Sequence, residues 1–508
     1  MLYLSKSKYC QFWQCPKLAW LSKYKPEVQE ISEDSKNRME TGNAVGDFAM
    51  GLFGEFVEAT TYDETGKLDL TYMINKTQEE IAKGTEVICE ASFSYEGFYC
   101  AVDILRKDGD GYSIYEVKSS STSLADLEIK PVYIADISYQ KYVLEHCGIN
   151  VTGTYLVTLN KDYVLEGELD LSGLFNVIEV SEYVIAEISN VERNLANAKM
   201  ILCSEVEPEI ELSNSCNKPY KCPFIKYCMR DIPKPSVFDL YKKRFDSMLK
   251  LYRKGIVTYS ELYDSGEIKN DKQLRQIDYY LHEHGTYAER EKIREFLGDL
   301  SYPLYFLDFE TMQLAVPIYS GTKPYRQIPF QYSLHFIEME GGLLQHKEFL
   351  ATSGEDPRRA IAEALCRDIP MNVCVTAYNK SFECDRIKEL ASDFPDLAEH
   401  LLNIASNIVD LAVPFQSGHY YNKAMGGSFS IKSVLPALYP DDPSLDYHNL
   451  EGVHNGTEAM TIYPKIKDMQ EDEQQEAIHN LLKYCELDTY AMVKVWEALV
   501  KVCEDTVE

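Results

Sequence analysis

The chain has 508 residues, of which 45% are hydrophobic and 12% aromatic, a composition that suits several folded domains and excludes a disordered protein. Its 81 acidic and 51 basic residues give a net charge of −30 at pH 7, which excludes indiscriminate coating of nucleic acid. Any phosphate-binding site must therefore be local, built from a few placed cations or from metal ions held by carboxylates.

The sequence predicts a cytoplasmic protein that does not enter a membrane. No stretch offers about eighteen uncharged apolar residues, and the N-terminus lacks the basic-then-apolar order of an export signal. In a reducing compartment most cysteines are expected to be small core residues. The cysteines expected in the core are Cys89, Cys100, Cys147, Cys374, Cys384 and Cys485.

The first half of the chain predicts a mixed α and β domain. Residues 97–118 alternate as two strands joined by the turn KDGDG, residues 132–147 predict a helix, and 151–160 predict a further strand.

Three residues of the predicted hairpin suit metal-dependent chemistry. Alternation places Glu116 and Lys118 on one face of the second strand, and the tight turn can bring Asp103 beside them. Two carboxylates can hold Mg or Mn, which activates water for phosphodiester hydrolysis, while the ammonium group positions that water. Taken alone, E-x-K is more often a cross-strand ion pair on an exposed strand.

This arrangement resembles the RecB-like PD-(D/E)XK nucleases. Gly42 and Gly46 resemble the family's first helical motif, with Asp47 where many relatives place His or Glu, and Glu90 resembles the acid that opens the next strand. The resemblance implies a restriction-endonuclease-like domain over 1–232. Its implied catalytic residues are Asp103, Glu116, Lys118 and Gln140, with Asp103 and Glu116 as metal ligands and with Leu144 in place of the family's usual Tyr.

A cysteine group accompanies this domain. Cys216, Cys222 and Cys228 stand at six-residue steps, and Cys15 lies near the N-terminus in a Cys-Pro context, with Cys10 as an alternative. The group resembles the iron-sulfur branch of the same nucleases, which includes the AddB nuclease and the CRISPR-associated adaptation nuclease. That resemblance implies a 4Fe-4S cluster on the four thiolates. Zinc, which also takes four thiolates, and no metal at all remain the alternatives.

Residues 233–300 predict a charged helical connector, and a second α/β domain follows over 301–508. In YFLDFET, Asp308 and Glu310 share one face of an apolar strand, where uncompensated acids are costly. In KYCELDTYAM, Tyr484 and Asp488 lie four residues apart on one helical face, and Glu383 begins a helix. Taken alone, the acid pair on the strand is more often a cap for a neighbouring helix, and the Tyr484–Asp488 spacing is more often an ordinary helix surface.

In order along the chain, these motifs resemble the DnaQ-like DEDD exonucleases, which have an RNase H-like fold. Glu383 stands for the usual Asp, the segment with Ser430 and Lys432 resembles the family's S-L-K helix, and Asp410 is a weaker match. The resemblance implies two Mg or Mn ions about 4 Å apart. The implied ligands are Asp308, Glu310, Glu383 and Asp488, with Tyr484 orienting the attacking water.

Together the motifs predict an α/β enzyme with two nuclease sites. The pairing of the two domains also resembles a bacterial family known as a domain of unknown function. The predicted substrate is DNA with exposed or single-stranded ends, in repair, processing or defence against foreign DNA. The alternatives are an RNA exonuclease, and a non-cutting scaffold whose acidic surface docks a partner. Strandedness, oligomeric state and partner proteins do not follow from the sequence.

Overall fold

The computed structural model describes residues 3–504, and the chain divides into two compact units. Unit 1 consists of Met1–Asp231 and Leu314–Arg326, and unit 2 consists of Ile232–Gln313 and Gln327–Glu508. The residues predicted as a connector, 233–300, fall within unit 2 by this division. The loop Leu314–Arg326 leaves and re-enters unit 2 between two of its strands, yet it belongs to unit 1.

Unit 1 is built on a mixed sheet that, among the described residues, has seven strands in the order β2-β3-β4-β5-β6-β7 with β1 beside β4. Strands β3, β4 and β5 form an antiparallel meander, β6 is parallel to β5, and β7 is antiparallel to β6. The strands are β1 (Leu4–Ser5), β2 (Val57–Glu58), β3 (Val87–Tyr95), β4 (Phe98–Asp108), β5 (Gly111–Thr122), β6 (Val151–Asn160) and β7 (Phe175–Glu179). This is the restriction-endonuclease-like, mixed α/β fold that the sequence predicts.

The β4–β5 hairpin confirms the predicted pair of strands and its turn. Asp108 pairs with Gly111, so that two residues close the loop, and Gly109 has a φ of 60°, which glycine adopts without strain. Strand β5 runs four residues past the predicted end, to Thr122. It is buried over its first seven residues because it lies inside the sheet.

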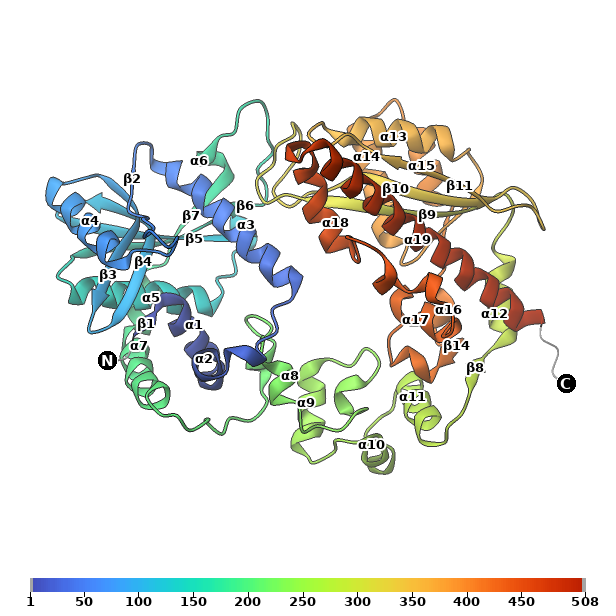
Figure 1. The fold of residues 1–508 in the computed structure, drawn as a ribbon, viewed down its shortest axis with the longest axis horizontal. Coiled ribbons are helices and arrows are strands. Elements are labelled where there is room, and N and C mark those ends of the chain that lie inside the picture. The colour runs from blue at the N-terminus through green and yellow to red at the C-terminus, as the bar shows by residue number, and fades with distance from the viewer. Residues whose placement is uncertain (1–2, 505–508) are drawn as a thin grey trace. The chain divides into compact units, whose positions relative to one another are not determined.

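Helices cover both faces of this sheet (Figure 1). Helix α5 packs against β3 and β4 and is flanked by α1 and α7. Helix α3 packs against β5, and α4 packs against β3. Cys147, predicted to be a core residue, is instead exposed, because it caps the end of α5 where the buried stripe of the helix has finished. The helices are α1 (Lys6–Gln14), α2 (Pro16–Tyr24), α3 (Glu33–Met50), α4 (Leu70–Lys83), α5 (Pro131–His146), α6 (Leu171–Leu174), α7 (Ser181–Leu202) and α8 (Ile225–Cys228).

The loop Leu314–Arg326 joins the core of unit 1. Ala315 and Val316 are buried in the same apolar cluster as residues of α3, β3 and β6. The loop also forms two backbone hydrogen bonds with Leu165: the amide of Leu165 donates to the carbonyl of Thr322 at 3.0 Å, and the amide of Gly321 donates to the carbonyl of Leu165 at 2.8 Å. A buried apolar pair and satisfied backbone groups explain why the loop is ordered there.

Unit 2 has a five-stranded sheet, counted over the described residues, in the order β11-β10-β9-β12-β13. Strands β9, β10 and β11 are antiparallel neighbours, and β12 and β13 run parallel to β9. This order and these directions are those of an RNase H-like fold, as predicted. The strands of unit 2 are β8 (Thr286–Ala288), β9 (Leu304–Gln313), β10 (Gln327–Ile337), β11 (Gln345–Leu350), β12 (Cys374–Ala377), β13 (Ile408–Asp410) and β14 (Tyr420–Asn422).

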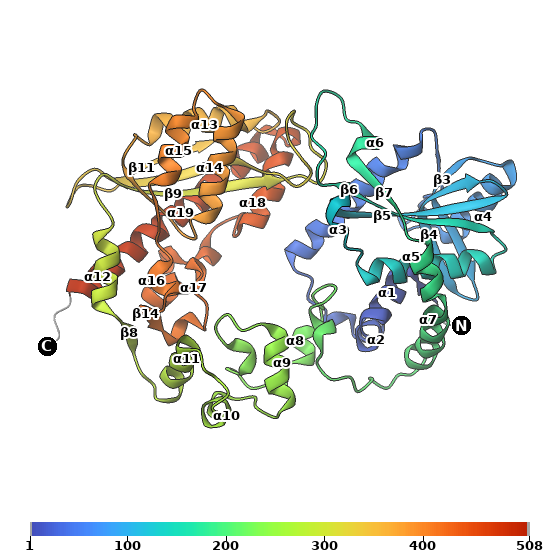
Figure 2. The same cartoon turned by 180° about the vertical axis from the view of Figure 1, so that it is seen from behind.

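Helices α13, α14 and α15 cover one face of this sheet, and α19 covers the other (Figures 1 and 2). Helix α19 begins with three acidic residues, which favour the positive end of a helix dipole. The helices are α13 (Pro357–Asp368), α14 (Ser381–Asp393), α15 (Ala398–Ser406), α16 (Val413–Gln416), α17 (Ile431–Leu438), α18 (Gly456–Ile462) and α19 (Glu471–Glu504).

The segment predicted as a connector contains helices around a small core of its own and one short strand, β8, which pairs with β14. Its helices are α9 (Phe245–Arg253), α10 (Tyr259–Ser265), α11 (Asp271–Leu281) and α12 (Arg290–Gly298). Over residues 3–504, no helix combines the length and the apolar character needed to cross a membrane.

Candidate active sites

The acids predicted in unit 2 meet on one face of its sheet. Asp308 and Glu310 lie two residues apart on β9, and Asp488 projects from α19, which packs on β9. One carboxylate oxygen from each of the three lies within 4.8 Å of the others. Hard oxygen ligands at this spacing could hold Mg or Mn.

Glu383 lines the same cavity, whose volume is about 460 Å³, together with Asp308, Glu310 and Asp488. Its side chain, on α14, is 3% exposed, and its Oε2 has no hydrogen-bond partner among the described residues. An unsatisfied buried carboxylate oxygen is costly, so a cation in the cavity would stabilise this side chain. Glu383 is not one of the three acids within 4.8 Å of each other.

Without a cation, these carboxyl groups hold protons more tightly than usual. Burial, reinforced by Asp488 and the neighbouring acids, raises the pKa of Asp308 and of Glu310 well above the ordinary range. Burial also raises the pKa of Glu383 to about 8 and that of Asp488 to about 6. The acid set therefore fits divalent cations, which would replace the protons and relieve the repulsion.

Tyr484, Lys432 and Tyr447 form the polar edge of this site. The ammonium group of Lys432 donates to the hydroxyl of Tyr484 at 3.2 Å and lies 4.7 Å from the ring centre of Tyr447. The hydroxyl of Tyr447 donates to Oδ1 of Asp488 at 2.7 Å. Tyr447 comes from a short turn without a periodic pattern, so sequence reasoning did not find it.

Asp410, the weaker sequence match, has a different position. Its Oδ1 accepts hydrogen bonds from the backbone amides of Asn379 and Ala412, both at 3.0 Å. These bonds fix the turn after β12, and Asp410 is not among the acids that line the cavity. Ser430 and Lys432 line a second cavity of about 220 Å³ that reaches Asp308 and Asp488.

The residues predicted in unit 1 also converge. Lys118 donates to Oε1 of Glu116 at 2.5 Å, and Gln140 donates to Oε2 of Glu116 at 2.7 Å. Asp103 accepts at 2.7 Å from the backbone amide of Val117. All four predicted residues therefore surround the middle of β5, at Glu116–Lys118.

Two residues that sequence reasoning missed complete this set. Lys6 on α1 lies between the two acids, 2.9 Å from Oδ1 of Asp103 and 3.1 Å from Oε2 of Glu116. Asp136 on α5 accepts from Lys118 at 2.7 Å. The spacing of Asp136, one helical turn before Gln140, is a signal that could have identified it.

The charges of this site are largely matched inside the protein. Burial favours the neutral form of Glu116, but Lys118 and Lys6 outweigh it and hold the pKa of that carboxyl well below its usual range. Burial and Glu116 raise the pKa of Asp136 to about 6. A divalent cation at Asp103 and Glu116 must therefore compete with Lys6.

Glu90 and the glycines of the first helical motif line the same cavity, whose volume is about 960 Å³. Glu90 has a φ of 54°, which is strained for a residue with a side chain, and burial and Asp103 raise its pKa to about 7. Gly42, Gly46 and Asp47 lie on α3 at the wall of the cavity. Leu144 is fully buried in the core instead.

The four predicted cysteines line one small cavity in unit 1. Cys15 lies between α1 and α2, Cys228 ends α8, and the backbone amide of Cys222 donates to the carbonyl of Cys216 at 2.8 Å. Cys10 lines the acid cavity instead. Burial raises the pKa of Cys222 to about 12, so a metal would be needed to keep its thiolate form.

The spacing of these sulfurs bears on the kind of metal. Over residues 3–504, three groups of potential ligands have their atoms within 4.8 Å of one another, and none contains these cysteines. Four thiolates on one zinc ion would lie about 3.8 Å apart, given a Zn–S bond of about 2.3 Å. Thiolates on a cluster are farther apart because each binds a different iron atom.

Comparisons with known proteins identify relatives without describing an activity. Residues 305–430, which include Asp308, Glu310 and Glu383, match the family described as "Domain of unknown function (DUF2779)". "Uncharacterized protein MG366 homolog" of Mycoplasma pneumoniae is 24% identical over 460 residues, which cover 78% of this chain and 68% of that protein. "Uncharacterized protein UU173" of Ureaplasma parvum is 27% identical over 229 residues, covering 39% and 31%.

Among solved structures, the crystal structure of the Aedes aegypti Nibbler EXO domain is similar to 42% of this chain and 84% of its own length, with 13% identity and a TM-score of 0.24. That score is too low to bear on the function.

Proposed function

We propose that the protein is a metal-dependent nuclease with two active sites, one in each unit. The observation that carries the proposal is the acid set of unit 2. Asp308, Glu310 and Asp488 bring carboxylate oxygens within 4.8 Å of one another at a cavity. Buried acids that repel one another persist in a folded protein when function demands them.

In unit 2, the proposed ligands of two Mg or Mn ions are Asp308, Glu310, Glu383 and Asp488. Bound divalent ions would activate a water molecule and neutralise the charge that develops on the phosphate. Tyr484, which accepts a hydrogen bond from Lys432, is the residue that we propose to orient that water, and the hydroxyl of Tyr447 donates to the carboxylate of Asp488. We assign release of nucleotides from the 3' end of a strand to this site, as the resemblance to the DEDD exonucleases implies.

In unit 1, Asp103 and Glu116 are the proposed metal ligands. Lys118 would position the attacking water, and Gln140 would hold Glu116 through the bond seen here. We assign end processing of DNA to this site, in repair or in defence against foreign DNA. RNA is the alternative substrate for either site.

The four cysteines are the proposed ligands of a 4Fe-4S cluster that joins the N-terminal helices to the segment after α7. Four sulfurs that line one cavity support a shared metal centre, for which zinc is the alternative. All fourteen cysteines are unpaired within residues 3–504. Protein purified without oxygen should be brown, whereas colourless protein that contains zinc would contradict the cluster.

A nuclease assay tests the main proposal. Single-stranded DNA and RNA of one sequence, labelled at the 5' end or at the 3' end, are incubated with Mg or Mn. We expect wild type to shorten the 5'-labelled strand stepwise. Asp308→Asn should not shorten it. Absence of cleavage of both polymers, with tight binding of ended DNA, would favour the scaffold instead.

A further inference from the structure

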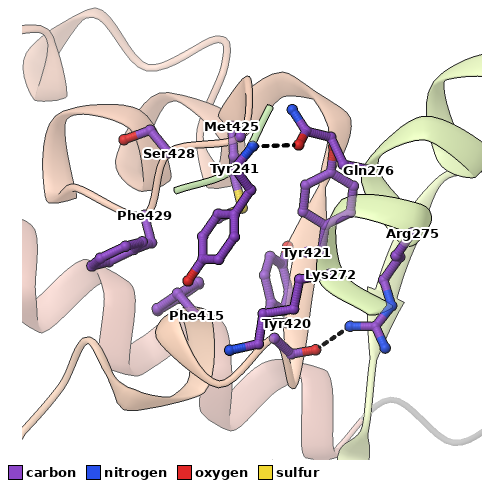
Figure 3. A pocket seen from close by; sticks show the side chains of 12 residues that line it. Tyr241, Lys272, Arg275, Gln276, Phe415, Tyr420, Tyr421, Met425, Ser428 and Phe429 are labelled. Atoms are coloured by element: carbon purple, nitrogen blue, oxygen red, sulfur yellow. Dashed lines mark hydrogen bonds between the residues drawn. The ribbon is translucent and has the colours of Figure 1, made fainter. Parts of the chain in front are cut away.

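A pocket in unit 2, outside the acid sites, combines aromatic rings with positive charge. We call it the Tyr241 pocket; it is lined by Tyr241, by Lys272, Arg275 and Gln276 of α11, and by residues between Phe415 and Phe429. Figure 3 shows Tyr241 between Phe429 and Gln276, with Lys272 and Arg275 along the lower edge. The rings of Tyr241 and Phe429 are 5.9 Å apart.

The cations of this pocket stand together in a strongly acidic chain. The exposed Lys242 places its ammonium group 4.2 Å from the ring centre of Phe429, and Lys272 donates to the backbone carbonyl of Gln416. Burial, with Lys242 and Arg275 nearby, lowers the pKa of Lys272. Lys242 and Arg275 therefore repel the ammonium group of Lys272, and a bound anion would relieve that repulsion.

The pocket is held in shape by hydrogen bonds from α11. The side chain of Gln276 accepts from the backbone amide of Tyr241 at 2.8 Å, and the side chain of Gln273 donates to the backbone carbonyl of Tyr241 at 2.7 Å. Gly427 has a φ of 78°, and a Cβ there would lie 2.4 Å from Nε2 of Gln276. The loop can approach Gln276 this closely because residue 427 is glycine.

Two connections lead from this pocket to the acid site of unit 2. The backbone carbonyl of Gln416 accepts from the hydroxyl of Tyr241 at 3.1 Å, and the side chain of Gln416 donates to Oδ1 of Asn379 at 2.6 Å. The hydroxyl of Tyr378 donates to the carbonyl of Phe429 at 2.6 Å. Asn379 and Tyr378 both line the cavities that contain Asp308.

We propose that the Tyr241 pocket binds the single-stranded part of the substrate, upstream of the nucleotide held at the acid site. This inference rests on the proposed function of unit 2. Unpaired bases stack on aromatic rings, and lysine and arginine contact the phosphates between them. The enclosed space is only about 20 Å³, enough for one water molecule, so a base lies against Phe429 and Tyr241 at the rim.

Binding measurements on the whole chain test this inference. A fluorescent ten-nucleotide DNA strand is titrated with protein in Ca²⁺ at several salt concentrations, so that binding is followed apart from cleavage. Lys242→Gln should weaken binding and lower the slope of log Kd against log salt by about 0.7, the value for one phosphate contact on a single strand. Lys250→Gln, an equally exposed lysine on α9, is the matched control and should leave both unchanged.

The variant Phe429→Leu tests whether bases stack on the aromatic rings of the pocket. Phe429→Leu should weaken binding of the strand about tenfold. The loss of affinity should be smaller for a strand of the same length that has no bases. The loss should also be greater for ten nucleotides than for two. Equal binding by Phe429→Leu and wild type, with equal salt slopes for Lys242→Gln and wild type, would overturn the proposal.

The two hypotheses fail separately. If wild type cleaves DNA and both pocket variants bind it normally, the pocket is not a substrate site and the proposed nuclease stands. If wild type cleaves nothing but the variants lose binding as described, the pocket binds nucleic acid and the proposed nuclease fails. Thermal unfolding of Lys242→Gln should match that of wild type, because this side chain is exposed.

Discussion

The two units differ in how their buried acids are neutralised in the absence of metal. In unit 1, Lys6 and Lys118 lie against Asp103, Glu116 and Asp136, so protein cations balance most of the negative charge. In unit 2, Lys432 stands at the edge, bonded to Tyr484 rather than to an acid.

This difference predicts different affinities for metal. A divalent cation entering unit 2 replaces protons on acids that repel one another, whereas one entering unit 1 must displace an ammonium group from Asp103 and Glu116. Unit 2 is therefore expected to bind Mn²⁺ more tightly.

The largest effect is expected from Asp308→Asn. Loss of this ligand should reduce nucleotide release from the 3' end more than about 100-fold, the upper end for residues that merely orient a ligand. The metal-free variant should be more stable, by about 1–3 kcal/mol, because the buried Asn needs neither a charge nor the uptake of a proton on folding. Asp385→Asn, an exposed acid on α14, is the control and should change neither rate nor stability. Full activity in Asp308→Asn would break the assignment.

The metal affinity of unit 2 should rise with pH. The raised pKa values of Asp488, about 6, and Glu383, about 8, mean that protons compete with Mn²⁺ over this interval. Each proton displaced gives up to about a tenfold gain per pH unit. Titrations with Mn²⁺ at pH 6, 7 and 8 measure the change, which a pH-independent affinity would contradict.

The same groups fix the sign of the stability change in metal-free protein. Because the carboxyl groups hold protons more tightly when folded than when unfolded, the free energy of unfolding should fall as pH rises from about 4 through 8. Saturating Mn²⁺ should remove that fall. Thermal unfolding with and without EDTA measures both.

Lys6→Met should affect unit 1 in the opposite direction. Without the ammonium group, Asp103 and Glu116 should bind Mn²⁺ about tenfold more tightly, while the metal-free protein should lose about 1–3 kcal/mol of stability. Lys8→Met, an exposed lysine on the same helix, is the control. Weaker Mn²⁺ binding in Lys6→Met would show that Lys6 assists the metal rather than replacing it.

The smallest effect is expected from Tyr447→Phe. The hydroxyl holds Asp488, and its loss should reduce the Mn²⁺ affinity of unit 2 about threefold to tenfold and cost about 1 kcal/mol. Tyr439→Phe is the matched control, because its hydroxyl also bonds to α19, at the carbonyl of Lys494. It should cost similar stability and leave Mn²⁺ affinity unchanged. Equal affinity losses in the two variants would mean that Tyr447 acts through overall stability and not through its bond to Asp488.

Much of each site could be predicted because the acids stand on regular elements. The period of two puts Asp308 and Glu310 on one face of β9, and the helical period puts Tyr484 and Asp488 on one face of α19. Lys6 could not be found this way, since one lysine on a short helix carries no periodic signal and Asp103 lies 97 residues away.

Other features depend on packing that no local pattern records. Ala315 and Val316 follow a strand of unit 2, and only the apolar cluster of unit 1 explains where they are buried. Cys147 was placed in the core because the apolar pattern of α5 continues to it, whereas the chain turns at that residue. The sequence patterns therefore identify most of the acids and Lys118, but not Lys6, Asp136 or Tyr447.

The most direct test of the contrast is the number of Mn²⁺ ions bound per chain, measured by electron paramagnetic resonance on wild type, Asp308→Asn and Glu116→Gln. We expect the tightest ions to be lost in Asp308→Asn and retained in Glu116→Gln. The same number of ions at the same affinity in wild type and Asp308→Asn would contradict a metal site in unit 2.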